Sequence, residues 1–146
     1  MRTIEVLLVD DNPADTELTS EVLARSGRSL HIHSVDDGVK AIEFLYRTGK
    51  YANALRPHFV ILDLSLPRKD GRAVLAEVKA DPCLRKIPIA IFSTSQARQD
   101  ITRSFELGAN CYVSKPGNLP DFISAVTAIG HFWFDLARLP YEENDD

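Results

Sequence analysis

The chain has 146 residues, of which 45% are hydrophobic and 26% are charged, and its net charge is −4 at pH 7. These values are typical of a soluble globular protein, and the length allows one sizeable core but not two ordinary domains. The acidic balance offers no basic surface for nucleic acid, so we expect no direct nucleic-acid partner. No apolar run is long enough to cross a membrane and no signal peptide precedes the first strand pattern, which predicts a cytoplasmic protein with no membrane partner.

Strand and helix patterns alternate along the chain. The predicted strands are Ile4 to Val9, His31 to Val35, Phe59 to Leu62, Ile89 to Phe92 and Cys111 to Ser114. Polar caps and Gly or Pro punctuation predict the intervening helices. These are expected from Asn12 to Gly27, from Asp37 to Gly49, from Asp70 to Asp81, around Ile101 to Gly108, and from about Leu119 onward.

Five strand–helix units in series predict an α/β fold. Because each crossover between parallel strands is right-handed, the helices cover both faces of a doubly wound five-stranded parallel sheet. The expected strand order is 2-1-3-4-5, which is the order of flavodoxin-like sheets.

The last predicted helix is apolar over an unusually wide arc. Its apolar residues span roughly 200°, whereas a helix lying on a sheet needs about half that width. The excess predicts burial against the chain's own extension or against a second subunit, and we expect a homodimer that buries Phe132, Trp133 and Leu136. The chain is accordingly divided into a domain at 1–130 and a C-terminal extension at 131–146, whose acidic end is expected to be disordered.

Charged side chains follow three of the predicted strands. Asp10 and Asp11 follow the first strand, Asp63 the third and Lys115 the fifth. Since ligands bind outside the carboxyl ends of parallel strands, these residues should converge in one pocket. Three crowded carboxylates need a cation among them, and such hard oxygen ligands suit Mg²⁺. The pocket therefore predicts transfer of a phosphoryl group to Asp63 as nucleophile, with Lys115 facing the phosphate.

Each of these residues also has a simpler interpretation. Taken alone, Asp63 would be interpreted as an aspartate in a turn. Helix capping would explain part of the Asp10-Asp11 pair. Ser93 ends the fourth strand, where its hydroxyl could donate to a phosphoryl oxygen. From residue type alone, the hydroxyls of Thr94 and Ser95 are competing candidates for this role. Tyr112 could move between exposed and buried positions, or it could be an ordinary packing aromatic.

Taken together, these residues resemble the receiver domain of two-component response regulators. The match covers roughly residues 4 to 130 and holds in order, type and spacing at Asp10-Asp11, Asp63, Ser93, Tyr112 and Lys115-Pro116. The resemblance implies that Asp63 accepts a phosphoryl group from the phosphohistidine of a sensor histidine kinase, with Ser93, Tyr112 and Lys115 as switch and catalytic residues. It also implies that Mg²⁺ or Mn²⁺ is bound by Asp11, Asp63 and the backbone carbonyl of Ser65, with Asp10 acting through water.

The extension is similar to that of stand-alone response regulators serving bacterial and cyanobacterial phytochrome kinases. This similarity rests on His131-Phe132-Trp133-Phe134 and on the segment 137–140. It implies a single-domain response regulator, with no effector domain, that signals by a phosphorylation-dependent surface change. A phytochrome kinase and a histidine phosphotransfer protein are the implied partners.

Two alternative functions and one further candidate metal site also have to be considered. A magnesium-dependent phosphohydrolase would use a similar aspartate, but Ser65 stands where such hydrolases usually place a second acid. A scaffold that needs no phosphate is disfavoured because every site residue is present. His31 and His33 alternate onto one face of an edge-type strand, a spacing that suits metal but more often marks an exposed strand.

Overall fold

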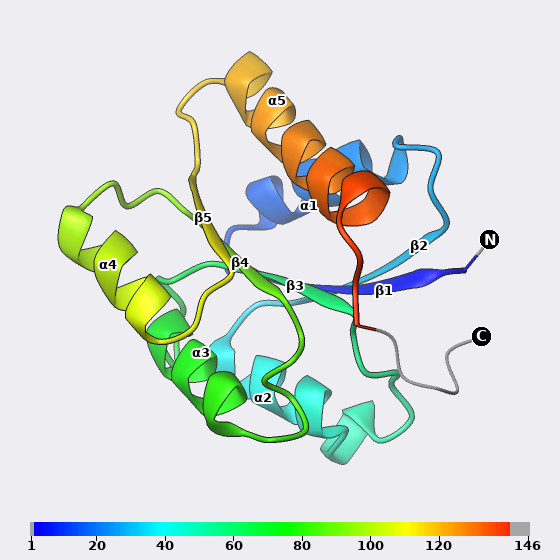
Figure 1. Ribbon diagram of the computed structural model, residues 1–146, viewed down its shortest axis with the longest axis vertical. Coiled ribbons are helices and arrows are strands. Elements are labelled where there is room, and N and C mark those ends of the chain that lie inside the picture. Colours follow the sequence, from blue (N-terminus) through cyan, green and yellow to red (C-terminus); the bar gives the residue numbers. More distant parts are fainter. Residues whose placement is uncertain (1, 141–146) are drawn as a thin grey trace.

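A parallel sheet of five strands forms the centre of the molecule (Figure 1). The computed structural model describes residues 2–140. The order β2-β1-β3-β4-β5 confirms the predicted topology and the α/β fold class. The strands are β1 (Ile4–Val9), β2 (Leu30–Val35), β3 (Phe59–Leu62), β4 (Ile89–Ser93) and β5 (Cys111–Ser114).

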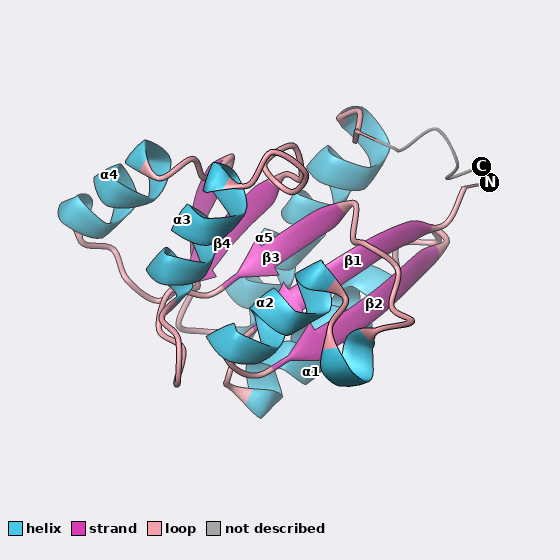
Figure 2. Cartoon of the chain, turned by 90° about the horizontal axis from the view of Figure 1, so that it is seen from below, coloured by secondary structure: helices cyan, strands magenta, loops and turns pink. Residues whose placement is uncertain are grey.

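Helices cover both faces of this sheet, as Figures 1 and 2 show. Helices α1 and α5 pack together on one face, while α2, α3 and α4 lie on the other side. The bounds are α1 (Pro13–Ala24), α2 (Gly38–Tyr46), α3 (Gly71–Ala80), α4 (Arg98–Glu106) and α5 (Leu119–Gly130). A short 3₁₀ helix (Gly49–Tyr51) follows α2, and a π-helical segment (His131–Leu136) follows α5.

Strand β1 separates two hydrophobic cores because its side chains alternate between the faces of the sheet. Val6 and Leu8 pack with residues of α1 and α5, whereas Leu7 and Val9 pack with residues of α2 and α3. All six residues of β1 are buried, which fits a central strand covered on both faces.

Two predicted helix ends are wrong by a few residues. Helix α1 ends at Ala24 and not at Gly27, because the N–H groups of Arg25 and Ser26 bond to the nearer carbonyls of Val22 and Leu23 and so form a turn before the glycine. Helix α2 ends at Tyr46 and not at Gly49, because Arg47 adopts the left-handed conformation with φ 56°. A non-glycine residue in this conformation is uncommon, so the sequence favoured the later glycine.

The extension packs largely against its own chain. Phe134 is 3% exposed and Leu139 is 8% exposed, and both belong to the core on the α1–α5 face. The Trp133 ring lies 5.0 Å from the Phe59 ring in β3. Trp133 is therefore a packing residue within the chain, although we expected a dimer to bury it. The predicted disordered end of the acidic tail lies outside the described residues.

Within residues 2–140, the structure contains no helix with the length and apolar character that crossing a membrane requires.

Candidate functional site

The Lys115 side chain joins three aspartates that come from different parts of the chain. Its ammonium nitrogen lies 2.7 Å from Asp10 Oδ2, 2.9 Å from Asp63 Oδ2 and 3.0 Å from Asp15 Oδ2. Asp10 follows β1, Asp63 follows β3 and Lys115 follows β5, so the carboxyl ends of three strands meet here as predicted. The side chain of Lys115 is only 3% exposed. The site is thus a buried ion cluster at one edge of the sheet.

Backbone groups fix the two buried carboxylates. The N–H of Asn12 donates to Asp10 Oδ1 at 2.9 Å, and the N–H of Ser65 donates to Asp63 Oδ1 at 3.3 Å. Each carboxylate therefore has one oxygen on Lys115 and one on the loop that follows its strand. The main chain orients the two acids in this way before any ligand binds.

Burial and charge act in opposite directions in this cluster. Burial alone would lower the pKa of Lys115, but its hydrogen bonds to Asp10 and Asp63 outweigh burial and raise that pKa, so the lysine stays charged. Burial raises the pKa of Asp10 in spite of the hydrogen bonds from Lys115 and the Asn12 N–H. The Asp10 carboxylate is therefore held at an electrostatic cost, which an additional cation would reduce.

A third carboxylate completes a donor set for such a cation. Ligand atoms of Asp10, Asp11 and Asp63 all lie within 4.8 Å of one another. Asp11 is exposed, in contrast to the two buried acids. With Asp15, which also contacts Lys115, the site brings together four carboxylates and one ammonium, which leaves an excess of negative charge. Oxygen donors with an open, solvent-facing side are the environment that Mg²⁺ and Mn²⁺ prefer.

The hydroxyl residues near the end of β4 have distinct surroundings. Ser93 is 2% exposed, and its main-chain carbonyl accepts a 2.7 Å hydrogen bond from the N–H of Lys115. Thr94 is exposed, and the Ser95 hydroxyl donates to Asp100 Oδ2 at 2.6 Å. Of the three candidates, Ser93 is thus the hydroxyl on the buried side of the site. The Tyr112 hydroxyl reaches the same loop, where it donates to the Ser95 carbonyl at 2.9 Å.

The loop after β3 is held in place by a close backbone approach. Gly71 begins α3, and its N–H donates to the Leu64 carbonyl at 2.9 Å. A Cβ atom at Gly71 would overlap the Asp63 carbonyl oxygen and lie 2.7 Å from Leu64 Cα. Only glycine fits this position, so the start of α3 sets the position of the Asp63 main chain.

Two acidic residues of this region were not predicted from the sequence. Asp15 lies in the first turn of α1, where an acid is readily explained by the helix dipole, yet it contacts Lys115. Asp100 lies in the first turn of α4 and pairs with both Ser95 and Arg72. Neither follows a strand directly, so the strand-end pattern could not identify them.

Comparison with known proteins agrees with this geometry. Residues 6–127 match the response regulator receiver domain. The chain belongs to the response regulator receiver family. This membership places it among signalling phosphoacceptors and not among the hydrolases considered above.

Individual relatives are similar over nearly their whole length. Response regulator Rcp1 from Synechocystis sp. is 43% identical over 135 residues, which are 92% of this chain and 92% of that protein. The structure of the phosphorylated cyanobacterial phytochrome response regulator RcpA superposes with a TM-score of 0.92 at 45% identity, covering 95% of this chain and 99% of RcpA. The Mn²⁺-bound structure of Rcp1 also gives a TM-score of 0.92, at 42% identity, covering 94% of this chain and 99% of that one.

Proposed function

We propose that this response regulator accepts a phosphoryl group on Asp63 from the phosphohistidine of a sensor histidine kinase. The observation that carries the proposal is the contact of 2.9 Å between the Asp63 carboxylate and the buried Lys115 ammonium, with Asp10 and Asp11 alongside. The reaction forms a bond between an Asp63 oxygen and phosphorus and breaks the bond between phosphorus and the kinase imidazole, which leaves with the electron pair.

The acidic residues are proposed to hold the divalent cation that this reaction needs. Asp10, Asp11, Asp63 and the backbone carbonyl of Ser65 would bind Mg²⁺ or Mn²⁺, and the Mn²⁺-bound form of Rcp1 supports this assignment. When bound, the ion supplies positive charge that neutralises the phosphoryl oxygens. Lys115 supplies a second, permanent positive charge on the buried side of Asp63.

The output is proposed to be a surface change that starts at Ser93. A phosphoryl group on Asp63 attracts the buried Ser93 hydroxyl, and the movement opens space near the loop that Tyr112 contacts. The ring of Tyr112 can then change its packing between β4, α4 and β5, so that one local charge selects between two arrangements of this surface.

A phytochrome kinase is the partner that we propose as phosphodonor, directly or through a histidine phosphotransfer protein. RcpA, which is 45% identical to this chain, is described as a phytochrome response regulator. Phosphotransfer from purified phytochrome kinases should therefore be faster than transfer from unrelated histidine kinases. Equal rates from both groups would contradict this assignment and leave the receiver chemistry intact.

The central test is the site of phosphorylation. Incubation with Mg²⁺ and a small phosphodonor should add one phosphate to the wild type and none to the Asp63→Asn variant, as measured by intact-protein mass spectrometry. The matched control is Asp135→Asn, which changes an exposed aspartate of the extension that pairs with Arg28 and His131. If Asp63→Asn is labelled as fully as the wild type, Asp63 is not the phosphoacceptor.

A further inference from the structure

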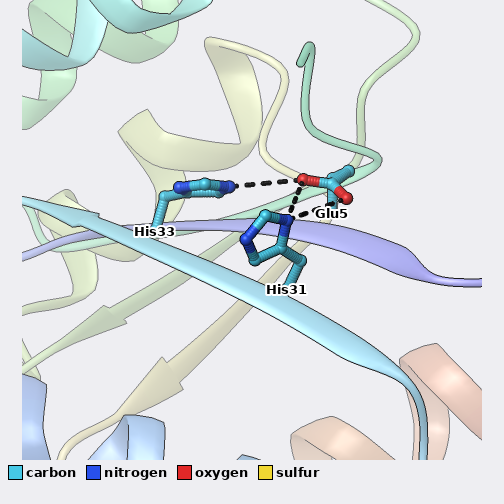
Figure 3. Close-up of side chains that lie close together, drawn as sticks. All are labelled: Glu5, His31 and His33. Atoms are coloured by element: carbon cyan, nitrogen blue, oxygen red, sulfur yellow. Dashed lines mark hydrogen bonds and ion pairs between the residues drawn. The ribbon is translucent and has the colours of Figure 1, made fainter. Parts of the chain in front are cut away.

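We propose that Glu5, His31 and His33 form a second metal site, for Zn²⁺, at the end of the sheet opposite the acidic pocket (Figure 3). Glu5 lies near the start of β1, whereas the acidic pocket begins after its last residue. The site is independent of the proposed phosphoryl transfer, because none of its three residues belongs to the acidic pocket.

Strand pairing brings the three side chains together. In the parallel register Glu5 is opposite His31 and Leu7 is opposite His33. Residues two apart on a strand point to the same face, so both imidazoles lie on the side of the sheet that carries Glu5. Figure 3 shows both rings turned toward the same carboxylate.

The distances fit metal ligands. His31 Nδ1 lies 3.2 Å from Glu5 Oε1, and His33 Nε2 lies 3.3 Å from the same oxygen. In a tetrahedral site with bonds of about 2.0–2.1 Å, two ligand atoms are about 3.3 Å apart. Strong charge-assisted hydrogen bonds are shorter, at about 2.7–2.9 Å. The three ligand atoms lie within 4.8 Å of one another, so a small shift of the rings would place them around one ion.

The Glu5 carboxylate is buried and its main chain is held by hydrogen bonds, while the two imidazoles are accessible to solvent. The Glu5 side chain is 7% exposed, whereas those of His31 and His33 are 59% and 31% exposed. The Glu5 N–H donates to His58 Nδ1 at 2.9 Å, and the His58 N–H donates to the Glu5 carbonyl at 2.8 Å. The His33 ring packs 5.2 Å from the ring of Phe44 in α2. A buried carboxylate with two accessible imidazoles leaves the fourth position of a tetrahedral ion open to water.

The donor types select the metal. Two imidazole nitrogens and one carboxylate oxygen suit Zn²⁺, whereas Mg²⁺ prefers the all-oxygen donors of the acidic pocket. Bound Zn²⁺ would link the edge strand β2 to the central strand β1 through side chains, and this link stabilises the folded state.

The test uses protein without a polyhistidine tag, treated with a chelator and kept in excess Mg²⁺ to occupy the acidic pocket. Calorimetry should show saturable uptake of one Zn²⁺, and Co²⁺ should give the visible absorption of a tetrahedral site. His31→Asn and His33→Asn should each weaken Zn²⁺ binding about tenfold or more. The control is His131→Asn, which removes an exposed imidazole paired with Asp135 and should leave binding unchanged.

NMR adds a measurement that does not depend on the folding of a variant. Zn²⁺ should shift the imidazole resonances of His31 and His33 in the wild type and leave those of His131 in place. Absence of saturable uptake in excess Mg²⁺ would overturn the proposal. An unchanged affinity in both strand variants, or an equal loss in His131→Asn, would overturn it as well.

Discussion

The Tyr112 hydroxyl donates a hydrogen bond of 2.9 Å to the Ser95 carbonyl, and this bond connects β5 to the loop that follows β4. The same loop begins after the buried Ser93, whose hydroxyl accepts from the Ser95 N–H at 3.4 Å. We therefore expect a movement of Ser93 to reach the atoms that Tyr112 contacts.

Ser93→Ala should uncouple phosphorylation from this movement. The variant should still take up phosphate on Asp63, but the change in the Tyr112 ring resonances on phosphorylation should be largely lost. NMR with labelled tyrosine measures this directly. Thr94→Ala, at the exposed neighbouring position, is the control and should respond like the wild type. A full response of Tyr112 in Ser93→Ala would show that the coupling takes another route.

Asp11→Ala should weaken Mg²⁺ binding more than Asp10→Asn does. Both oxygens of Asp10 already accept hydrogen bonds, from Lys115 and from the Asn12 N–H, whereas Asp11 is exposed. Asp11 is therefore the acid better placed to be a direct ligand. Calorimetric titration with Mg²⁺ measures both affinities, and equal or reversed effects would contradict this division of roles.

Gly71→Ala should destabilise the protein by about 1–3 kcal/mol, because the new methyl group meets main-chain atoms of Asp63 and Leu64 that cannot move independently. Phosphate uptake should also slow, since the Asp63 loop has to shift. Urea unfolding measures the change in stability. Gly117→Ala is the control, because a Cβ at Gly117 has no other atom within 4 Å. Equal stability of the two variants would show that the loop yields easily.

Tyr46 should lose its hydroxyl proton at a higher pH than an ordinary tyrosine. The Tyr46 hydroxyl donates to Asp81 Oδ2 at 2.6 Å, and this bond raises the pKa of Tyr46 to about 12. The folded-state pKa lies above the ordinary value of about 10. The contribution of this bond to stability is therefore complete below pH 10 and is lost as the pH rises toward 12.

The titration of phenolate absorbance tests this assignment. Asp81→Asn should move the last tyrosine transition toward the ordinary value, and Tyr46→Phe should remove that transition. A titration curve of Asp81→Asn that superimposes on the wild-type curve would contradict the role of the hydrogen bond.

We also expect the protein to form a homodimer through exposed apolar residues of α5 and the extension. Phe132 is 51% exposed and Leu136 is 64% exposed after the rest of the extension has packed. Phe132→Glu should give monomers, because two-fold pairing places the new charge against its own copy. Phe105→Glu is a matched control, since Phe105 in α4 is also 51% exposed. Sedimentation at matched micromolar concentrations measures both variants, and a monomeric wild type would refute the dimer.

The sequence predicts the sheet and the strand-end residues well for one physical reason. Parallel strands bring their carboxyl ends to one edge, so residues as distant as Asp10 and Lys115 can be assigned to one pocket without a structure. Contacts of side chains that lie within a helix or a strand, and not at a strand end, cannot be predicted from this rule. Asp15 reaches Lys115 from a helix, and Glu5 meets His31 only through the register of β1 and β2. The end of α2 at Tyr46 depends on the left-handed conformation of Arg47, which a non-glycine residue rarely adopts, so the residue type did not indicate it.

The packing of the extension restricts how this protein can be joined to other molecules. Phe134 lies 5.6 Å from the Phe59 ring at the start of β3, the strand whose other end leads to Asp63. A fluorescent reporter or affinity label fused directly after Gly130 would displace Phe134 and Leu139 from the core and expose the base of that strand. Labels intended to leave the phosphoacceptor undisturbed should therefore be attached beyond residue 140.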